Sequence, residues 1–371
     1  MKVDKTKWEK CKLEDLCTNE SSNIVISKVE IGRGNYSLFG ASGLIGNIDF
    51  YQQERPYIGI VKDGSGVGRV AKYPSFTSLV GTMQYILPKE NVDIDYLHYL
   101  LVSLHLNKYV KGAAIPHIYF RHYKSEKTYL PPLSDQQTIA AELDSIQTMI
   151  DGYKAQLTDL DALAQSIFLD MFGDPVTNPK GWEVKKLFEI VQKTCALTYG
   201  IVQPGDEYPN GVPVVRSIDM SSSIIQLSNL KKVNPSIAEK FKRTTLVGDE
   251  IFISCRGVTG MISLASPELK GGNITRGLVS ARLEIGEKYF VYYCLKMPQL
   301  NDLIQSQTKG ATLRQINVKD IRLLPIIFPP LSLQQQFADR IEAIEYQKGQ
   351  IRQQFTDAEL LMAERMQYYF S

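Results

Sequence analysis

Cysteine and histidine are scarce in this 371-residue chain. Its five cysteines are odd in number and none form a Cys-x-x-Cys pair, which argues against a disulfide framework and against a zinc site. The four histidines have no carboxylate or cysteine at ligand spacing, so we expect structural histidines. The sequence therefore predicts free, mostly buried thiols and no metal.

Long apolar runs are also missing. No segment approaches the roughly 18 apolar residues of a membrane span, and the opening MKVDKTKWEK lacks the apolar core of a signal peptide. The composition, 44% hydrophobic and 22% charged, is that of an ordinary globular protein. The length predicts two or three domains, each with its own core. We expect a cytoplasmic protein with no membrane partner.

Catalytic motifs are absent in the same way. The chain has no Walker-type Gly-Lys-Ser/Thr, no His-Glu-x-x-His and no Gly-x-Ser-x-Gly. It also lacks the Pro-Asp…Asp/Glu-x-Lys pattern of nucleases and the Asn/Asp-Pro-Pro-aromatic motif of amino-methyltransferases. The sequence thus predicts a non-catalytic chain whose chemistry belongs to a partner.

What the chain does contain is an internal repeat. Residues 131–138 read PPLSDQQT and residues 329–336 read PPLSLQQQ. In that register, residues 111–173 align without a gap with residues 309–371, and the identities include KGA at each start, both Gln pairs and a Thr-Asp step. This pattern indicates a tandem duplication.

Each copy continues as a long helix after its Pro pair. Apolar residues recur at alternating steps of four and three, which is typical of a helix that packs along another helix. Each helix is expected to span about 39 residues, or roughly 58 Å, with Ser134 and Ser332 as N-caps and Gly173 as a C-cap. We predict that the two helices pair antiparallel; the alternative is that each packs only on its own domain. The predicted pairing residues are Ile139, Leu143, Ile146, Ile150, Leu157 and Leu160 in the first copy and Phe337, Ile341, Ile344, Ile351, Phe355 and Met362 in the second.

A strand-rich segment precedes each helix. Short runs of β-branched and aromatic residues punctuated by glycine predict strands, and one helix closes each set, near residues 93–110 and 288–307. The fold class is therefore α+β, with boundaries at 1–130, 131–173, 174–328 and 329–371. Both segments contain a strand, a basic glycine-rich turn and a strand, VKDGSGVG and SCRGVTG. These turns either approach phosphates and bases or are ordinary hairpin turns.

Charge is distributed unevenly although the net charge is only +2. Two mildly basic globular segments alternate with two acidic helical ones, so a polyanion is attracted to the former. The acidic face of the first helix, with Asp144, Asp151, Asp159 and Asp161, is expected to be solvated or to face a partner.

The order of these features resembles the specificity subunit of type I restriction-modification enzymes. The Pro-Pro-Leu-Ser-x-Gln-Gln motif, QSIFLDMFGDP at 165–175 and VGDEIFISCRG at 247–257 carry the resemblance, which covers the whole chain. It implies two target-recognition domains held by two long antiparallel coiled-coil helices in a pseudo-twofold repeat. The low identity between the globular halves predicts two different half-sites, and hence an asymmetric bipartite target in double-stranded DNA.

The resemblance also implies partners and cofactors. Two methyltransferase subunits would dock on the helices and modify adenine at N6 with S-adenosylmethionine, and two restriction/translocase subunits would use ATP and Mg. This chain itself would hold no cofactor. Two alternatives stay open: a specificity module for another restriction-modification type, which gene neighbours would reveal, and a coiled-coil scaffold that does not bind DNA.

Candidate DNA contacts follow from residue type and loop position, with a solvated surface charge as the alternative for each. In the first domain they are Arg33, Tyr36, Ser42, Lys62, Ser65, Arg69, Lys72 and His117; in the second they are Tyr199, Gln203, Arg216, Arg256, Thr259, Arg276, Lys309 and Arg314.

Overall fold

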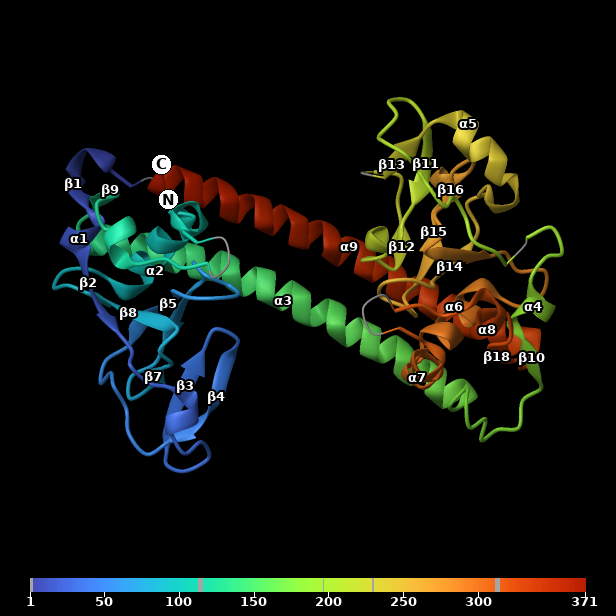
Figure 1. Ribbon diagram of the computed structural model, residues 1–371, viewed down its shortest axis with the longest axis horizontal. Helices are drawn as coiled ribbons and strands as arrows, with labels where there is room; N and C mark the ends of the chain where they lie inside the picture. Colours follow the sequence, from blue (N-terminus) through green and yellow to red (C-terminus); the bar gives the residue numbers. More distant parts are fainter. Residues whose placement is uncertain (1–2, 113–115, 196, 229, 311–313) are drawn as a thin grey trace. The chain divides into compact units, whose positions relative to one another are not determined.

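The computed structural model describes residues 3–112, 116–195, 197–228, 230–310 and 314–371. The chain divides into two compact units (Figure 1). Unit 1 comprises residues 1–155 and 352–371, and unit 2 comprises residues 156–351. Each unit therefore contains one half of each long helix, together with the globular segment next to it.

Unit 1 alternates short strands with short helices before the first long helix. Its elements are η1 Lys5–Lys7, β1 Glu9–Lys12, α1 Leu13–Leu16, β2 Cys17–Ser21, η2 Ile26–Lys28, β3 Tyr36–Gly40, β4 Gly43–Ile48, β5 Tyr57–Val61, β6 Val70–Tyr73, β7 Ser78–Leu79, β8 Met83–Pro88, α2 Ile94–Ser103, η3 Leu106–Tyr109, η4 Phe120–His122, β9 Lys127–Leu130 and α3 Leu133–Phe172.

Unit 1 has small sheets of four, three and two strands in its described residues. They are ordered β2-β8-β5-β6, β4-β3-β7 and β1-β9. Every residue of β5 is buried, because this central strand is covered on both faces. Asp93 is the N-cap of helix α2, since its carboxylate accepts hydrogen bonds from the N–H groups of Asp95 and Tyr96. The helix buries Leu97 and Leu100 in the main core of unit 1.

Unit 2 repeats this composition with different connections. Its elements are β10 Val184–Lys186, α4 Leu187–Ile190, β11 Val212–Val215, η5 Ser217–Asp219, β12 Ile224–Ile225, β13 Lys231–Val233, α5 Pro235–Ala238, η6 Glu239–Thr244, β14 Ile251–Ser254, β15 Ile262–Ala265, η7 Pro267–Leu269, β16 Asn273–Ile274, β17 Leu278–Ala281, α6 Lys288–Lys296, α7 Pro298–Gln307, α8 Val318–Arg322, β18 Pro325–Ile327 and α9 Leu331–Phe370.

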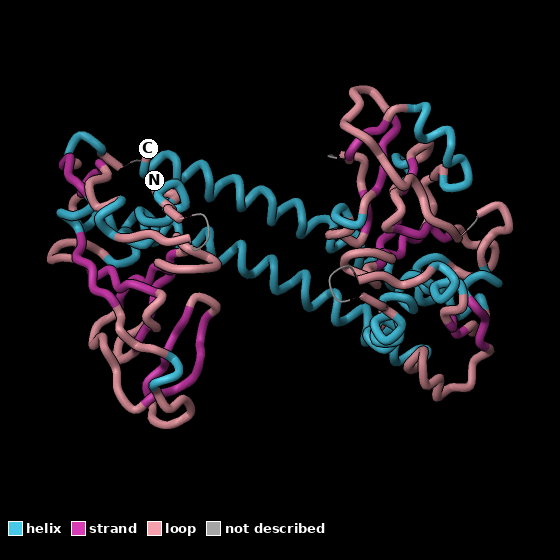
Figure 2. The backbone as a smooth tube through the Cα atoms, viewed as in Figure 1, coloured by secondary structure: helices cyan, strands magenta, loops and turns pink. Residues whose placement is uncertain are grey.

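The sheets of unit 2 are ordered β12-β15-β14-β17, β13-β11-β16 and β10-β18. The strand order β15-β14-β17 corresponds to β6-β5-β8 of unit 1, and in both units a strand at the start of the segment pairs with the strand before the long helix. Figure 2 shows the same mixture of strands and helices in both units. The prediction of mixed α and β content is confirmed.

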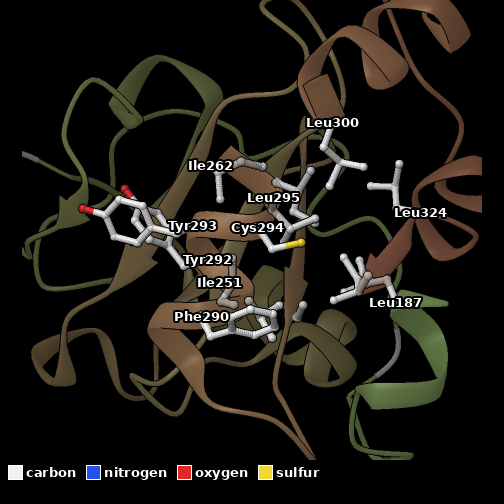
Figure 3. Packing of buried hydrophobic residues seen from close by; sticks show 14 of the residues in the cluster. Leu187, Ile251, Ile262, Phe290, Tyr292, Tyr293, Cys294, Leu295, Leu300 and Leu324 are labelled. Atoms are coloured by element: carbon white, nitrogen blue, oxygen red, sulfur yellow. The ribbon is translucent and has the colours of Figure 1, made fainter. Parts of the chain in front are cut away.

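Helix α6 contributes six consecutive buried residues, 290–295, to the main core of unit 2. Phe290, Tyr292, Tyr293 and Leu295 are all buried, and Figure 3 shows them among the side chains that pack with Ile251 of β14 and neighbouring residues. Burying large aromatic and aliphatic side chains of this kind contributes about 1.5–3 kcal/mol each. The helix therefore fixes the sheet that carries the β14–β15 hairpin.

The long helices contact each other within each unit, and they run in opposite directions. In unit 1, Glu142 of α3 accepts a hydrogen bond from the Tyr369 hydroxyl of α9 at 2.6 Å and pairs with Arg365 at 2.9 Å. Ile146 and Ile150 pack in one cluster with Ala358. In unit 2, Phe168 contacts Phe337 at a ring-centroid distance of 5.6 Å. Later residues of α3 thus meet earlier residues of α9.

The predicted pairing residues lie in three places. In unit 1, Ile139 and Leu143 lie in the main core with Tyr369, while Ile146, Ile150, Phe355 and Met362 form a separate cluster. In unit 2, Phe337, Ile341 and Ile344 lie in the main core, with Leu160 packed against it. Leu157 and Ile351 are half-buried and belong to none of these clusters.

A lysine interrupts the apolar seam of α9 in unit 2. Lys348 is fully buried, and its Nζ lies 2.9 Å from Asp161 Oδ1 of α3 and 2.6 Å from Glu345 Oε1. Lys296 of α6 also reaches Asp161, at 3.4 Å. Burial alone would raise the pKa of Asp161, but the Lys348 hydrogen bond and the two ammonium charges hold it below its ordinary value.

Three local predictions are wrong. The single helix expected near residues 288–307 is two helices, because Pro298 starts a new helix directly after Met297. The helix expected over 93–110 ends at Ser103, and His105 adopts a left-handed conformation, φ +47°. The predicted N-caps Ser134 and Ser332 lie inside helices that begin one residue earlier.

The four aspartates predicted on the acidic face of α3 differ in exposure. Asp151 and Asp159 are exposed, whereas Asp144 and Asp161 are half-buried. Asp144 accepts a hydrogen bond of 2.6 Å from Tyr99 of α2 and lies near Lys72. Among the described helices, none has both the length and the apolar character needed to cross a membrane.

Candidate nucleic-acid interface

In unit 2, the glycine-rich turn after β14 is hydrogen-bonded to the loop before α8. Ile316 N donates to Cys255 O at 3.0 Å, and Gly257 N donates to Arg314 O at 3.0 Å. These two bonds flank an antiparallel bridge between Arg256 and Gln315. The bridge places the two opposed side chains next to each other on one face.

A second bridge extends this arrangement. Lys309 and Gln315 exchange both backbone hydrogen bonds, at 2.8 and 2.9 Å. Residues opposed in an antiparallel bridge share a face, so Lys309, Gln315 and Arg256 form a row of three side chains. We call it the unit 2 row. Lys309 and Gln315 are exposed and Arg256 is half-buried.

The same construction occurs in unit 1. Ile118 N donates to Lys62 O at 2.8 Å and Gly64 N donates to Pro116 O at 3.0 Å, flanking a bridge between Asp63 and His117. His117 also exchanges two backbone bonds with Lys111, at 2.9 and 2.8 Å. Lys111, His117 and Asp63 therefore form the unit 1 row. The two rows match position for position although only their lysines are identical.

In each glycine-rich turn, one glycine lies directly against a neighbouring helix, η3 in unit 1 and α7 in unit 2. Gly68 and Gly260 have φ of +86° and +80°, where L side chains are strained. A Cβ on Gly68 would lie 2.6 Å from Asn107 Oδ1, and one on Gly260 would lie 2.4 Å from Asn301 Oδ1. Glycine thus lets each turn pack closely on η3 or α7, which fixes the position of the adjacent row.

Arg256 is the most distinctive side chain of the unit 2 row. Its guanidinium carbon lies 5.6 Å from the centre of the Tyr199 ring, a cation–π distance. Its Nε is buried and has no hydrogen-bond partner within the described residues. The neighbouring Arg314, whose side chain is exposed, donates to Gln305 Oε1 at 2.9 Å. Two of the predicted DNA contacts thus flank the same turn.

Aromatic and basic groups surround the unit 1 row. The rings of His117 and Tyr119 lie 5.2 Å apart, and Arg121 lies 4.6 Å from the Tyr119 ring centre. Desolvation, together with the nearby cations Lys111 and Arg121, lowers the pKa of His122. At neutral pH His122 is therefore uncharged.

Some predicted contacts are engaged elsewhere in the protein. Thr259 is buried, and its backbone carbonyl accepts from Gln305 Nε2 at 2.8 Å, so this residue holds the turn instead of facing outward. Lys72 bonds to Asp95 of α2. Arg33 pairs with Glu30 at 2.6 Å.

The remaining predicted DNA contacts do not belong to the unit 1 row or the unit 2 row. Arg69 is exposed and donates to Ala41 O at 2.7 Å, which brings it beside the exposed Ser42. Arg216 pairs with Asp219 at 2.8 Å. Three more of the predicted contacts, Ser65, Gln203 and Arg276, are exposed, and Lys62 is half-buried. The ring of Tyr36 packs edge-on against that of Tyr51.

Three residues of the rows were missed by the sequence prediction: Lys111, Asp63 and Gln315. The repeat contained the signal for two of them, because the ungapped alignment pairs Lys111 with Lys309 and His117 with Gln315. Asp63 lies outside that alignment, and only the backbone bridges reveal that it corresponds to Arg256.

Metal or thiol chemistry has no support at this site. The described residues contain no group of three or more His, Cys, Asp or Glu arranged to hold a metal ion. All five cysteines are free and four are buried. Burial raises the pKa of Cys255, the cysteine next to Arg256, to about 12, so its thiol is protonated at neutral pH.

Comparison with known proteins gives a consistent result. The family model described as "Type I restriction modification DNA specificity domain" matches twice, over residues 5–160 and 179–357. The type I restriction enzyme EcoBI specificity subunit of Escherichia coli is 23% identical over 280 residues, covering 68% of this chain and 58% of that protein. The MjaIX specificity subunit of Methanocaldococcus jannaschii is 25% identical over 310 residues, covering 75% and 68%.

The fold has solved counterparts. The S subunit of a type I restriction-modification system from M. genitalium matches with a TM-score of 0.63 and 14% identity, over 100% of this chain and 98% of that one. A chain from a study of complex assembly in the type I R-M system matches with a TM-score of 0.50 and 16% identity. These similarities concern the fold, and the matched region spans little more than half of the E. coli relative.

Proposed function

The chain belongs to the type I restriction modification DNA specificity family, and from this premise we propose that it is a non-catalytic subunit that binds a bipartite, asymmetric target in double-stranded DNA. Its two recognition domains are residues 1–130 and 174–328. Residues 131–173 and 329–371 are the helices that hold them in a pseudo-twofold, coiled-coil arrangement.

The observation that carries this proposal is the duplicated row. Both units hold a glycine-rich turn against a loop with equivalent backbone bonds, and in both a lysine ends the row. A lysine common to both rows suits the phosphate backbone, which is the same at every site. The other positions differ between the rows, His117 and Asp63 against Gln315 and Arg256, as expected of two readers of different half-sites.

The long helices support the bipartite part of the proposal. An unbroken helix of 40 residues extends for about 60 Å, and buried contacts join it to its partner helix in both units. Helices of this kind would keep two readers at a fixed spacing, so that the target contains an unspecified stretch between its half-sites.

The same helices offer similar surfaces for partners. Two related copies of one surface favour two copies of one partner, so we propose that two methyltransferase subunits dock on them and that two restriction/translocase subunits join. S-adenosylmethionine, ATP and Mg would then be bound by those partners. Such a complex acts on chromosomal DNA, so the proposed location is the cytoplasm.

Salt dependence tests DNA binding directly. The full chain is titrated with a duplex that contains its target and with a scrambled duplex, at several salt concentrations. Contacts to phosphates predict that affinity falls linearly on a log–log plot with a slope near −0.9 per contact, with the target bound more tightly throughout. An affinity that is weak and independent of salt would instead indicate a scaffold that does not bind DNA.

A further inference from the structure

The two rows differ in one chemically informative way. At the turn position the unit 2 row carries Arg256 and the unit 1 row carries Asp63, so equivalent places hold opposite charges. A cation and an anion at the same place do not serve a shared structural role. The difference suits two readers that contact different bases, because a cation donates hydrogen bonds and a carboxylate accepts them.

Neither side chain has an ion-pair partner among the residues that the structure describes, whereas Arg216 and Arg33 are paired with nearby carboxylates. Arg256 in addition has a buried Nε without a partner, although leaving such a donor unpaired is unfavourable. The cation–π contact with Tyr199, at 5.6 Å, limits the conformations of the guanidinium, and a planar guanidinium can present two parallel N–H donors to a ligand.

Resting on the function proposed above, we propose that Arg256 and Asp63 are the equivalent base-reading residues of the two recognition domains, Arg256 for guanine and Asp63 for cytosine. Arginine donates two parallel hydrogen bonds to guanine O6 and N7, and a carboxylate accepts from the cytosine N4 amino group. Lys309 and Lys111, which occupy the same place in both rows, bind phosphate and carry no sequence preference.

The test is selection from a random duplex library by the full chain, followed by sequencing. In Arg256→Ala, guanine enrichment at one position of one half-site should fall about tenfold to a hundredfold, while the other half-site is unchanged. In Asp63→Asn, preference at one position of the other half-site should move from cytosine toward adenine, because an amide presents a donor and an acceptor.

Two further variants separate base contacts from phosphate contacts. Arg256→Lys keeps the charge but not the two-pronged geometry, so it should retain affinity for unselected DNA and lose the guanine preference. Lys309→Ala should weaken all sequences alike and reduce the salt slope by about one. Arg243→Ala, a change of an exposed arginine on η6, is the matched control and should alter nothing.

Each result decides a different question. If Arg256→Ala or Arg256→Lys weakens binding to all sequences equally, or leaves the guanine preference in place, this inference is wrong and the proposed function stands. If the wild-type chain enriches no sequence at all, the proposed function itself fails. Thermal unfolding of every variant confirms that a loss of preference is measured on folded protein.

Discussion

The side chain of Gln136 on α3 accepts a hydrogen bond of 2.8 Å from the backbone N–H of Asp93, the N-cap of α2. Its amide also donates to Pro131 O and Asn91 O, at 2.9 and 3.0 Å. In unit 2, Gln334 accepts from Glu287 N, the N-cap of α6, and donates to Pro329 O. The first glutamine of each repeated pair thus ties a long helix to the N-terminus of a shorter helix of the same unit, α2 in unit 1 and α6 in unit 2.

Replacing this glutamine should destabilise the protein. Gln136→Ala leaves a half-buried N–H and two carbonyl groups without their side-chain partner, so we expect a loss of about 3 kcal/mol in the free energy of unfolding, measured by urea titration. The matched control is Gln137→Ala, because that second glutamine is exposed, and its effect should stay within about 0.5 kcal/mol. Equal effects of the two changes would contradict the assigned role.

Lys348 is expected to be essential for the pairing of α3 with α9 in unit 2. Lys348→Met leaves the carboxylates of Glu345 and Asp161 without their buried cation, which should cost about 3 kcal/mol of stability. The double variant Lys348→Met/Glu345→Gln should lose less than the sum of the single changes, since one uncompensated charge is removed. Arg340→Ala on the exposed side of α9 serves as control. Additive effects would mean that the charges are not coupled.

His98 should make stability depend on pH. Burial, with a smaller effect of Lys72, lowers its pKa from the ordinary 6.5 to about 4. Above pH 6.5 the imidazole is neutral in both states; as the pH falls from 6.5 to 4, only the unfolded chain takes up the proton. Stability is therefore full above pH 6.5, and about 3 kcal/mol of it is lost by pH 4.

His98→Gln, which cannot titrate, should flatten this part of the curve of unfolding free energy against pH. An NMR titration of the His98 ring protons measures the pKa directly. A midpoint near 6.5 would contradict the expected burial.

The close contact of Gly260 with α7 gives a steric prediction. Gly260→Ala places a Cβ 2.4 Å from Asn301 Oδ1 at a positive φ, so we expect a loss of about 2–3 kcal/mol in unfolding free energy. Gly257→Ala is the control, because its φ is also positive, at +77°, but nothing lies within 4 Å. It should cost only the backbone strain, about 1 kcal/mol. Similar losses would show that the contact with α7 is unimportant.

Features that depend on the order of neighbouring residues could be predicted from the sequence. A seam at steps of four and three indicates a long helix, and α3 and α9 each extend over 40 residues. The β14–β15 hairpin follows equally from two short runs of β-branched and aromatic residues joined by a glycine-rich turn. The break at Pro298 was missed, although the residue itself signals it, because proline favours the first turn of a new helix over a helix interior.

Features that depend on tertiary contacts were not predictable. Asp63 is one residue in a polar turn, and only its bridge to His117, far along the chain, gives it a counterpart in Arg256. Likewise, Lys348 interrupts the apolar pattern of α9. A buried ammonium group needs a nearby carboxylate, and Asp161, which supplies one, lies on the other long helix. Sequence periodicity identifies the helix face on which a residue lies, but it does not identify the residue on another element that pairs with it.

Mapping of methylated adenines across the genome, in otherwise identical strains with and without the gene, tests the central claim most directly. The account predicts one motif that depends on the gene, made of two different half-sites separated by a fixed number of unspecified base pairs. A single uninterrupted motif, or a methylation pattern that is the same in both strains, would contradict it.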